Sequence, residues 1–157
     1  MDYIRAMLPP LCLLVTSNSV PWLLGRACGT RGAAPLDFGL RLPDGERLFG
    51  AHKTWRGLAG AMAGTALVAW LAGLTPGLGV AFGALAMMGD LLSSCVKRRL
   101  RLQPGHDVAG LDQLPECLLP LVGLARPLAL DVTAIAVLAA AFTLGHLLIA
   151  RLLPRAG

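Results

Sequence analysis

Five apolar segments separated by polar stretches set the pattern of the chain. They run over about 4–24, 57–74, 77–96, 111–125 and 128–153. A helix needs roughly 20 apolar residues to cross about 30 Å of hydrocarbon, and the second, third and fifth segments meet that need. The fourth is short and contains Pro115, Glu116 and Pro120, which favours a kinked span or a re-entrant piece. The pattern predicts one all-α membrane domain over residues 1–157, with five transmembrane helices.

Composition supports the membrane class. Hydrophobic residues make up 55% of the 157 positions and charged residues only 15%, whereas soluble domains place about a quarter of their residues in charge. The net charge of +5 would suggest nucleic acid for a soluble protein. Here the basic residues cluster between apolar segments, so topology and anionic ligands explain them better, and we expect no nucleic-acid partner.

The distribution of basic residues predicts the orientation. With five spans and the N-terminus outside, 12 of the 14 Lys and Arg residues lie inside, and only Arg5 and Arg126 lie outside. Cytoplasmic loops carry such an excess of positive charge. We therefore expect a multi-pass protein of the inner (plasma) membrane with a cytoplasmic C-terminus. Arg5 alone is a poor basic region for a signal peptide, so we expect the first segment to be a span.

The polar stretch between the first two segments contains turn and phosphate-binding chemistry. Pro43-Asp44-Gly45 is a strong turn signal between short extended stretches, which predicts a small cytoplasmic hairpin, with an irregular loop as the alternative. The stretch ends in Lys53, Thr54 and Arg56 at the start of the second segment. A helix N-terminus with cations favours phosphate, although basic residues with a Trp beside a span are also ordinary interfacial anchors.

The third segment carries an ionisable group within an apolar helix. At 100° per residue, Asp90 shares a polar stripe with Ser94 and Lys97, and Asp90 and Lys97 lie about 10 Å apart along the axis. One interpretation is a carboxylate that holds Mg²⁺ beside basic groups that bind phosphate. The other is an Asp90 paired with an arginine inside the bundle, with the basic residues anchoring the helix at the headgroups.

A second set of carboxylates lies at the start of the fourth segment. Asp107, Asp112 and Glu116 supply oxygen ligands of the type that Mg²⁺ prefers. Asp112 and Glu116 are four residues apart and would share a helix face, although Pro115 makes a regular turn uncertain. His106 lies nearby as a further candidate.

These clusters follow one another in a specific order between the apolar segments. The ordered pieces are Asn18-x-x-Pro21, Pro35-Leu36-Asp37-Phe38-Gly39, Asp44-Gly45 with Arg47, Leu48-Phe49-Gly50, Lys53-Thr54-Trp55-Arg56-Gly57, Gly89-Asp90 with Ser94, Lys97-Arg98-Arg99 and Gly110-Leu111-Asp112-Gln113. This set, from Asn18 to about Leu121, resembles the CDP-archaeol synthase family. Those proteins are integral-membrane CTP-dependent cytidylyltransferases related to CTP:phosphatidate cytidylyltransferases.

The resemblance implies five transmembrane helices, a site at the cytoplasmic surface, and Mg²⁺-dependent transfer of CMP from CTP to a lipid phosphate with release of pyrophosphate. Together with the chemistry above, it assigns the metal to Asp90, Asp112 and Glu116. The remaining candidates are Lys97 and Arg98 as catalytic residues and, for CTP and its phosphates, Asn18, Asp37, Lys53, Thr54, Arg56 and Ser94.

One position departs from the family pattern. Family members often have a second acid three residues after the aspartate that matches Asp112, and here that position is Pro115, with Glu116 as a neighbouring substitute. An inactive homologue that binds or scaffolds lipid, and a transporter that uses Asp90 as a relay, therefore stay open as alternatives. So do the ester or ether chemistry of the lipid and a homodimer packed through Gly60-x-x-x-Gly64.

Overall fold

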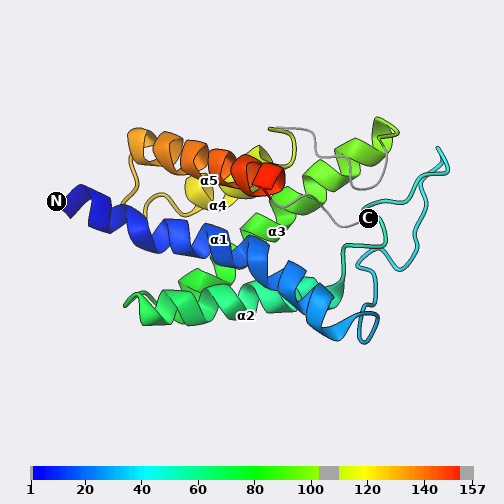
Figure 1. Ribbon diagram of the computed structural model, residues 1–157, viewed down its shortest axis with the longest axis horizontal. Helices are drawn as coiled ribbons and strands as arrows, with labels where there is room; N and C mark the ends of the chain where they lie inside the picture. Colours follow the sequence, from blue (N-terminus) through cyan, green and yellow to red (C-terminus); the bar gives the residue numbers. More distant parts are fainter. Residues whose placement is uncertain (1, 103–109, 153–157) are drawn as a thin grey trace.

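The computed structural model describes the backbone of residues 2–102 and 110–152 and the side chains of residues 5–102 and 110–148. Its helices are α1 (Asp2–Cys28), α2 (Trp55–Leu71), α3 (Pro76–Arg99), α4 (Gln113–Gly123) and α5 (Val132–Leu152). Successive helices run in opposite directions (Figure 1). The end of α1, the start of α2, the end of α3 and the start of α4 therefore gather at one end of the bundle, beside the 29–54 segment. The all-α class with five helices is confirmed.

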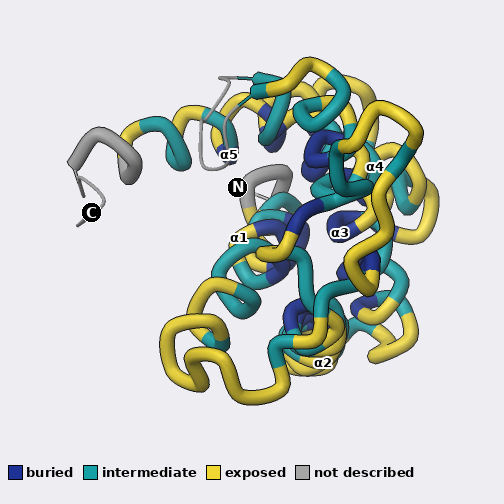
Figure 2. Tube along the Cα trace, turned by 90° about the vertical axis from the view of Figure 1, so that its right-hand side faces the viewer, coloured by how far each residue is buried: buried dark blue, intermediate teal, exposed yellow. Residues whose placement is uncertain are grey.

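The outer faces of the helices are apolar. Figure 2 shows exposed residues along the outside of each helix, and many are large hydrophobic residues, among them Val15, Trp22, Leu67, Trp70, Leu71, Leu92, Val122, Leu144 and Leu148. So much exposed apolar surface is unfavourable in water and suits contact with lipid tails. Within the described residues, α1 over Arg5–Cys28 and α3 are long and apolar enough to cross a membrane, and the described Val132–Leu148 part of α5 is a shorter apolar helix.

The fourth helix is the exception in length. Its 11 residues extend about 16 Å at 1.5 Å per residue, about half of a hydrocarbon core about 30 Å thick. The helix packs against α3 and buries Cys117, Pro120 and Leu121. Pro115 lies in its first turn, where a missing N–H leaves no hydrogen bond unmade. The turn there is regular, and the crossing of the membrane by all five helices stays a prediction.

Small residues hold the first three helices close together. A Cβ on Gly60 would lie 2.2 Å from Leu24 of α1, and one on Gly64 would lie 3.0 Å from Val20. On the other side of α2, a Cβ on Gly79 of α3 would lie 2.3 Å from a backbone oxygen of α2. The Gly60-x-x-x-Gly64 motif is thus used within the chain, where it seats α2 against α1.

The 29–54 segment contains the expected hairpin in a minimal form. Arg41 and Arg47 form an isolated antiparallel bridge, and the Leu48 N–H donates to the Leu40 carbonyl at 3.0 Å. Gly45 takes the turn with φ +82°. The hairpin therefore closes at Asp44-Gly45, as the turn signal predicts.

Candidate active site

The chain entering α2 is held in place by backbone pairing. The Leu36 N–H donates to the Lys53 carbonyl at 2.7 Å, and the Trp55 N–H donates to the Ala34 carbonyl at 3.0 Å. Thr54 caps α2, since its Oγ1 accepts from the Gly57 N–H at 3.1 Å. These contacts fix the direction in which Lys53 leaves the backbone.

Asp37 organises the rest of the 29–54 segment. Its side chain is fully buried and accepts hydrogen bonds from the Arg47 guanidinium and from the N–H groups of Gly39, Phe49 and Gly50. Burial alone would raise the pKa of this carboxyl. The Arg47 and backbone donors outweigh it and hold the pKa of Asp37 well below its ordinary value.

The segment delivers Lys53 to the carboxylate of α3. The Lys53 Nζ lies 2.6 Å and 2.5 Å from the two carboxylate oxygens of Asp90, and each side chain is 24% exposed. One of the sequence alternatives, an arginine partner for Asp90, is wrong, because the partner is Lys53. Ser94 donates its hydroxyl to the Asp90 backbone carbonyl at 2.8 Å, which ties the hydroxyl to the helix beside this ion pair.

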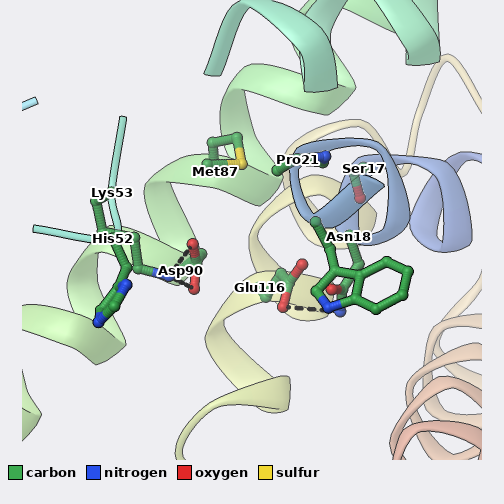
Figure 3. Close-up of a pocket in the computed structure, with 9 residues that line it drawn as sticks. Ser17, Asn18, Pro21, His52, Lys53, Met87, Asp90 and Glu116 are labelled. Atoms are coloured by element: carbon green, nitrogen blue, oxygen red, sulfur yellow. Dashed lines mark hydrogen bonds and ion pairs between the residues drawn. The ribbon is translucent and has the colours of Figure 1, made fainter. Parts of the chain in front are cut away.

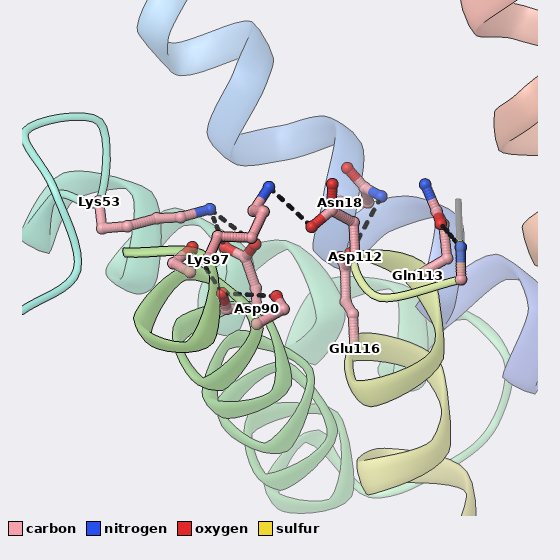
Figure 4. Close-up of polar contacts among 10 residues, drawn as sticks. Asn18, Lys53, Asp90, Lys97, Asp112, Gln113 and Glu116 are labelled. Carbon is pink, nitrogen blue, oxygen red and sulfur yellow. Dashed lines mark hydrogen bonds and ion pairs between the residues drawn. The ribbon is translucent and has the colours of Figure 1, made fainter. Parts of the chain in front are cut away.

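A second pair joins α3 to the start of α4. The Lys97 Nζ lies 2.7 Å from Oδ1 of Asp112, which immediately precedes α4, where the positive end of the helix dipole favours a carboxylate. One turn later, the buried Glu116 accepts a long hydrogen bond of 3.4 Å from the Asn18 amide of α1. Figure 4 shows Lys53, Asp90, Lys97, Asp112 and Glu116 gathered where α3 and α4 meet.

Gly89 makes this meeting of helices possible. A Cβ at this position would lie 2.1 Å from the Pro115 carbonyl oxygen and 2.6 Å from the Cα of Glu116. Only a glycine leaves room for the α4 backbone here. The close contact brings Glu116 beside Asp90, the residue that follows Gly89.

A cavity of about 210 Å³ opens beside this group. Figure 3 shows its lining from α1, α3, α4 and the end of the 29–54 segment. The lining residues are Ser17, Asn18, Pro21, Trp22, His52, Lys53, Met87, Asp90 and Glu116. The cavity thus combines two carboxylates, a lysine and an amide with an apolar wall.

The donor set was compared with the needs of Mg²⁺. Asp90, Asp112 and Glu116 supply carboxylate oxygens, which Mg²⁺ prefers, and Mg²⁺ usually binds one or two protein carboxylates together with waters and substrate phosphates. Within the described ranges, no three His, Cys, Asp or Glu side chains are arranged to hold one ion, and Lys53 and Lys97 lie against the two aspartates. The residues therefore fit a cation shared with a phosphate ligand, not a closed protein cage.

The other candidates lie around this centre. Arg98 lines a second cavity between the end of α3 and the 29–54 segment. Arg56 binds the backbone carbonyls of Arg31 and Gly29, so in the structure it joins α2 to the loop, as Thr54 and Asp37 also serve local structure. Their predicted contacts with substrate stay predictions. His106 and Asp107 lie outside the described residues.

Sequence reasoning missed part of the cavity wall. His52 belongs to the basic cluster before α2 but was not chosen as a site residue, and Ser17 and Trp22 lie one position before Asn18 and one after Pro21. The Asn18-x-x-Pro21 motif was the available signal, because residues that flank a motif on the same helix face share its cavity.

The fold and the site define a helical membrane protein with a charged centre for phosphate-bearing ligands at one end of the bundle. The chain belongs to the CDP-archaeol synthase family (CarS-like), whose family model matches residues 14–154. The family predicted from the ordered motifs is confirmed.

Relatives and a solved structure agree with this membership. A CDP-archaeol synthase of Pyrococcus furiosus is 39% identical over 107 residues, which is 62% of this chain and 60% of that protein. One of Aeropyrum pernix is 37% identical over 122 residues, 73% of this chain and 63% of that protein. The matches thus span about three fifths of the length of these relatives. A solved structure described as an intramembrane enzyme for archaeal membrane lipid biosynthesis has a TM-score of 0.69 and 31% identity, and the match covers 96% of this chain and 93% of that one.

Proposed function

We propose that this protein is a CTP-dependent cytidylyltransferase that converts a membrane lipid phosphate, of the phosphatidate or archaetidate type, into a CDP-lipid and releases pyrophosphate. The observation that supports this proposal most is the meeting of the Lys53–Asp90 and Lys97–Asp112 pairs beside one cavity. Membership in a family whose curated relatives are CDP-archaeol synthases supports the same reaction.

The reaction is a substitution at phosphorus. An ionised oxygen of the lipid phosphate attacks the α-phosphorus of CTP and forms a new P–O bond. The bond from the α-phosphorus to the oxygen that bridges to the β-phosphorus breaks, and its electron pair leaves on that oxygen with pyrophosphate. The attacking phosphate is already ionised near neutral pH, so the protein needs no general base. Placement and charge stabilisation are its main tasks.

The described side chains suit those tasks. Lys53, Lys97 and Arg98 supply positive charge to the phosphates, and Asn18 can donate an amide hydrogen bond into the cavity. Asp90, Asp112 and Glu116 would hold Mg²⁺. When bound, Mg²⁺ would neutralise phosphate charge and polarise the α-phosphate. The apolar wall with Trp22 would accept the lipid side of the substrate.

We further propose that the site faces the cytoplasm. The end of the bundle that carries Asp90 and Asp112 also carries the basic 29–54 segment and the basic end of α3, as the positive-inside rule expects of a cytoplasmic face. A soluble nucleotide and a lipid anchored in the leaflet can meet at such a surface.

The test is turnover by the purified full chain in lipid vesicles with CTP, Mg²⁺ and a lipid phosphate. CDP-lipid identified by mass spectrometry, with one pyrophosphate released for each molecule formed, is the expected result. Ether and ester lipid phosphates in competition would identify the preferred substrate. Lipid binding without turnover under all these conditions would contradict the proposal and favour an inactive homologue.

A further inference from the structure

A second cavity lies beside the first, on the side of the 29–54 segment. Its volume is about 260 Å³. The lining consists of Arg41, Glu46, Arg47, Gly50, Ala51, His52 and Arg98. Three arginines face one glutamate, whereas the first cavity has two carboxylates and one lysine among its charged lining residues. The two neighbouring spaces therefore have opposite electrostatic character.

The arginines of the second cavity differ in how far the protein already uses them. Arg47 is neutralised by Asp37, and Arg41 donates to the Gly45 carbonyl at 2.8 Å. Arg98 lies against Gly50, where a Cβ would lie 3.2 Å from its Nη2, and its buried Nε has no hydrogen-bond partner among the described residues. Arg98 is therefore a guanidinium with donors to offer, held against a backbone that only a glycine keeps clear.

His52 lines both cavities. It immediately precedes Lys53, whose ammonium group binds Asp90 in the first cavity, and Figure 3 shows the imidazole beside the Lys53 side chain. A chain of phosphates that extends from one cavity into the other would pass this imidazole.

We propose that the arginine-lined cavity binds the terminal diphosphate of the nucleotide, and that His52 contacts the phosphate chain where it passes between the two cavities. This inference rests on the proposed function and assigns a place to its leaving group. In-line substitution requires the attacking lipid phosphate and the departing pyrophosphate on opposite sides of the α-phosphorus. As the bond to the bridging oxygen breaks, its electron pair adds negative charge to the pyrophosphate. Arginine forks bind such an anion bidentately.

Pyrophosphate itself is the probe. Its dissociation constant for the full-length protein, without CTP or lipid, is measured by titration calorimetry in detergent. Arg98→Gln should weaken binding at least about tenfold, since it removes charge-assisted hydrogen bonds, and His52→Ala should weaken it about threefold to tenfold. Arg31→Gln is the matched control. Arg31 lies in the same segment with an exposed side chain outside both cavities, and its removal lowers the charge equally, so affinity should stay within about twofold.

Further arms separate this site from other phosphate sites and from misfolding. Arg98→Lys keeps the charge but loses the fork, and an intermediate affinity at an unchanged melting temperature would support the arginine geometry. Orthophosphate should bind more weakly and lose less on Arg98→Gln. In turnover assays His52→Ala should raise KM for CTP and leave KM for the lipid phosphate unchanged. A raised KM for the lipid alone would overturn the assignment.

Failure of this inference differs from failure of the proposed function. Turnover of CTP with equal pyrophosphate affinity in the wild type, Arg98→Gln and Arg31→Gln proteins would overturn the second cavity as a diphosphate site while the activity stands. Absence of turnover in the wild type would refute the proposed function, even if pyrophosphate binding depends on Arg98.

Discussion

Gly89 provides a sharp test of how the centre is assembled. Replacement by alanine adds one methyl group at the contact between α3 and α4. That carbon would meet the Pro115 carbonyl oxygen at 2.1 Å, its carbon at 2.4 Å and the Cα of Glu116 at 2.6 Å. All three atoms belong to the α4 backbone, so no side-chain rotation can relieve the contact.

The magnitude follows from these distances. Real Cβ atoms essentially never lie within 3.0 Å of such neighbours, so α4 must retreat by at least about 0.9 Å near Pro115. Overpacking of this kind costs about 1–3 kcal/mol, against a gain of up to about 1 kcal/mol in helix propensity. Glu116 moves with the helix, and a displacement of about 1 Å at a reacting centre lowers turnover by about 100-fold. We therefore expect a clear loss of kcat with a modest loss of stability.

The assay measures pyrophosphate release and thermal unfolding of the same preparations. Gly145→Ala is the control, because a Cβ there meets no atom within 4 Å, and it should keep wild-type kcat. Wild-type kcat and melting temperature in Gly89→Ala would refute the reasoning, since the contact could not then constrain α4.

Three further predictions concern individual charges. Asp90→Asn and Asp112→Asn should each abolish turnover while expression and membrane insertion stay normal, and wild-type turnover in either would remove the metal assignment. Lys53→Ala should raise KM for CTP about tenfold, as expected for a lost charge-assisted contact, and an unchanged KM would count against its phosphate role. Asp37→Asn should lower stability near pH 7 by about 2 kcal/mol, or about 4–8 °C in Tm. Because folding lowers the pKa of Asp37 from 3.8, its contribution is present above that pH and is lost below it. The difference in Tm should therefore shrink as pH falls below 3.8, and a difference independent of pH would contradict this account.

Local patterns predicted the helices and part of the centre. The apolar segments fixed the number of helices, because a run of apolar residues with few breakers has one favourable structure in lipid. The helical wheel also put Asp90, Ser94 and Lys97 on one stripe of α3, as the structure bears out. These inferences depend on neighbours within a few turns of helix.

The partners of those residues could not be predicted in the same way. Lys53 lies 37 positions before Asp90, and it arrives there through bridges that involve Pro35 and Thr54. Asp37 was read as a substrate contact because it belongs to a motif, whereas its carboxylate is satisfied by backbone N–H groups that no sequence pattern displays. The role of Gly89 depends on the approach of a helix that begins 24 residues later.

The order of the paired residues along the chain has a consequence for biosynthesis. Lys53 precedes Asp90, Lys97 precedes Asp112, and Asn18 precedes Glu116. Each acidic residue therefore leaves the ribosome when its partner has already been made. An unpaired carboxylate in hydrocarbon costs several kcal/mol, so this order lets each acid be neutralised or hydrogen-bonded as its helix is inserted. The final centre is in this way compatible with stepwise insertion of a nascent polypeptide.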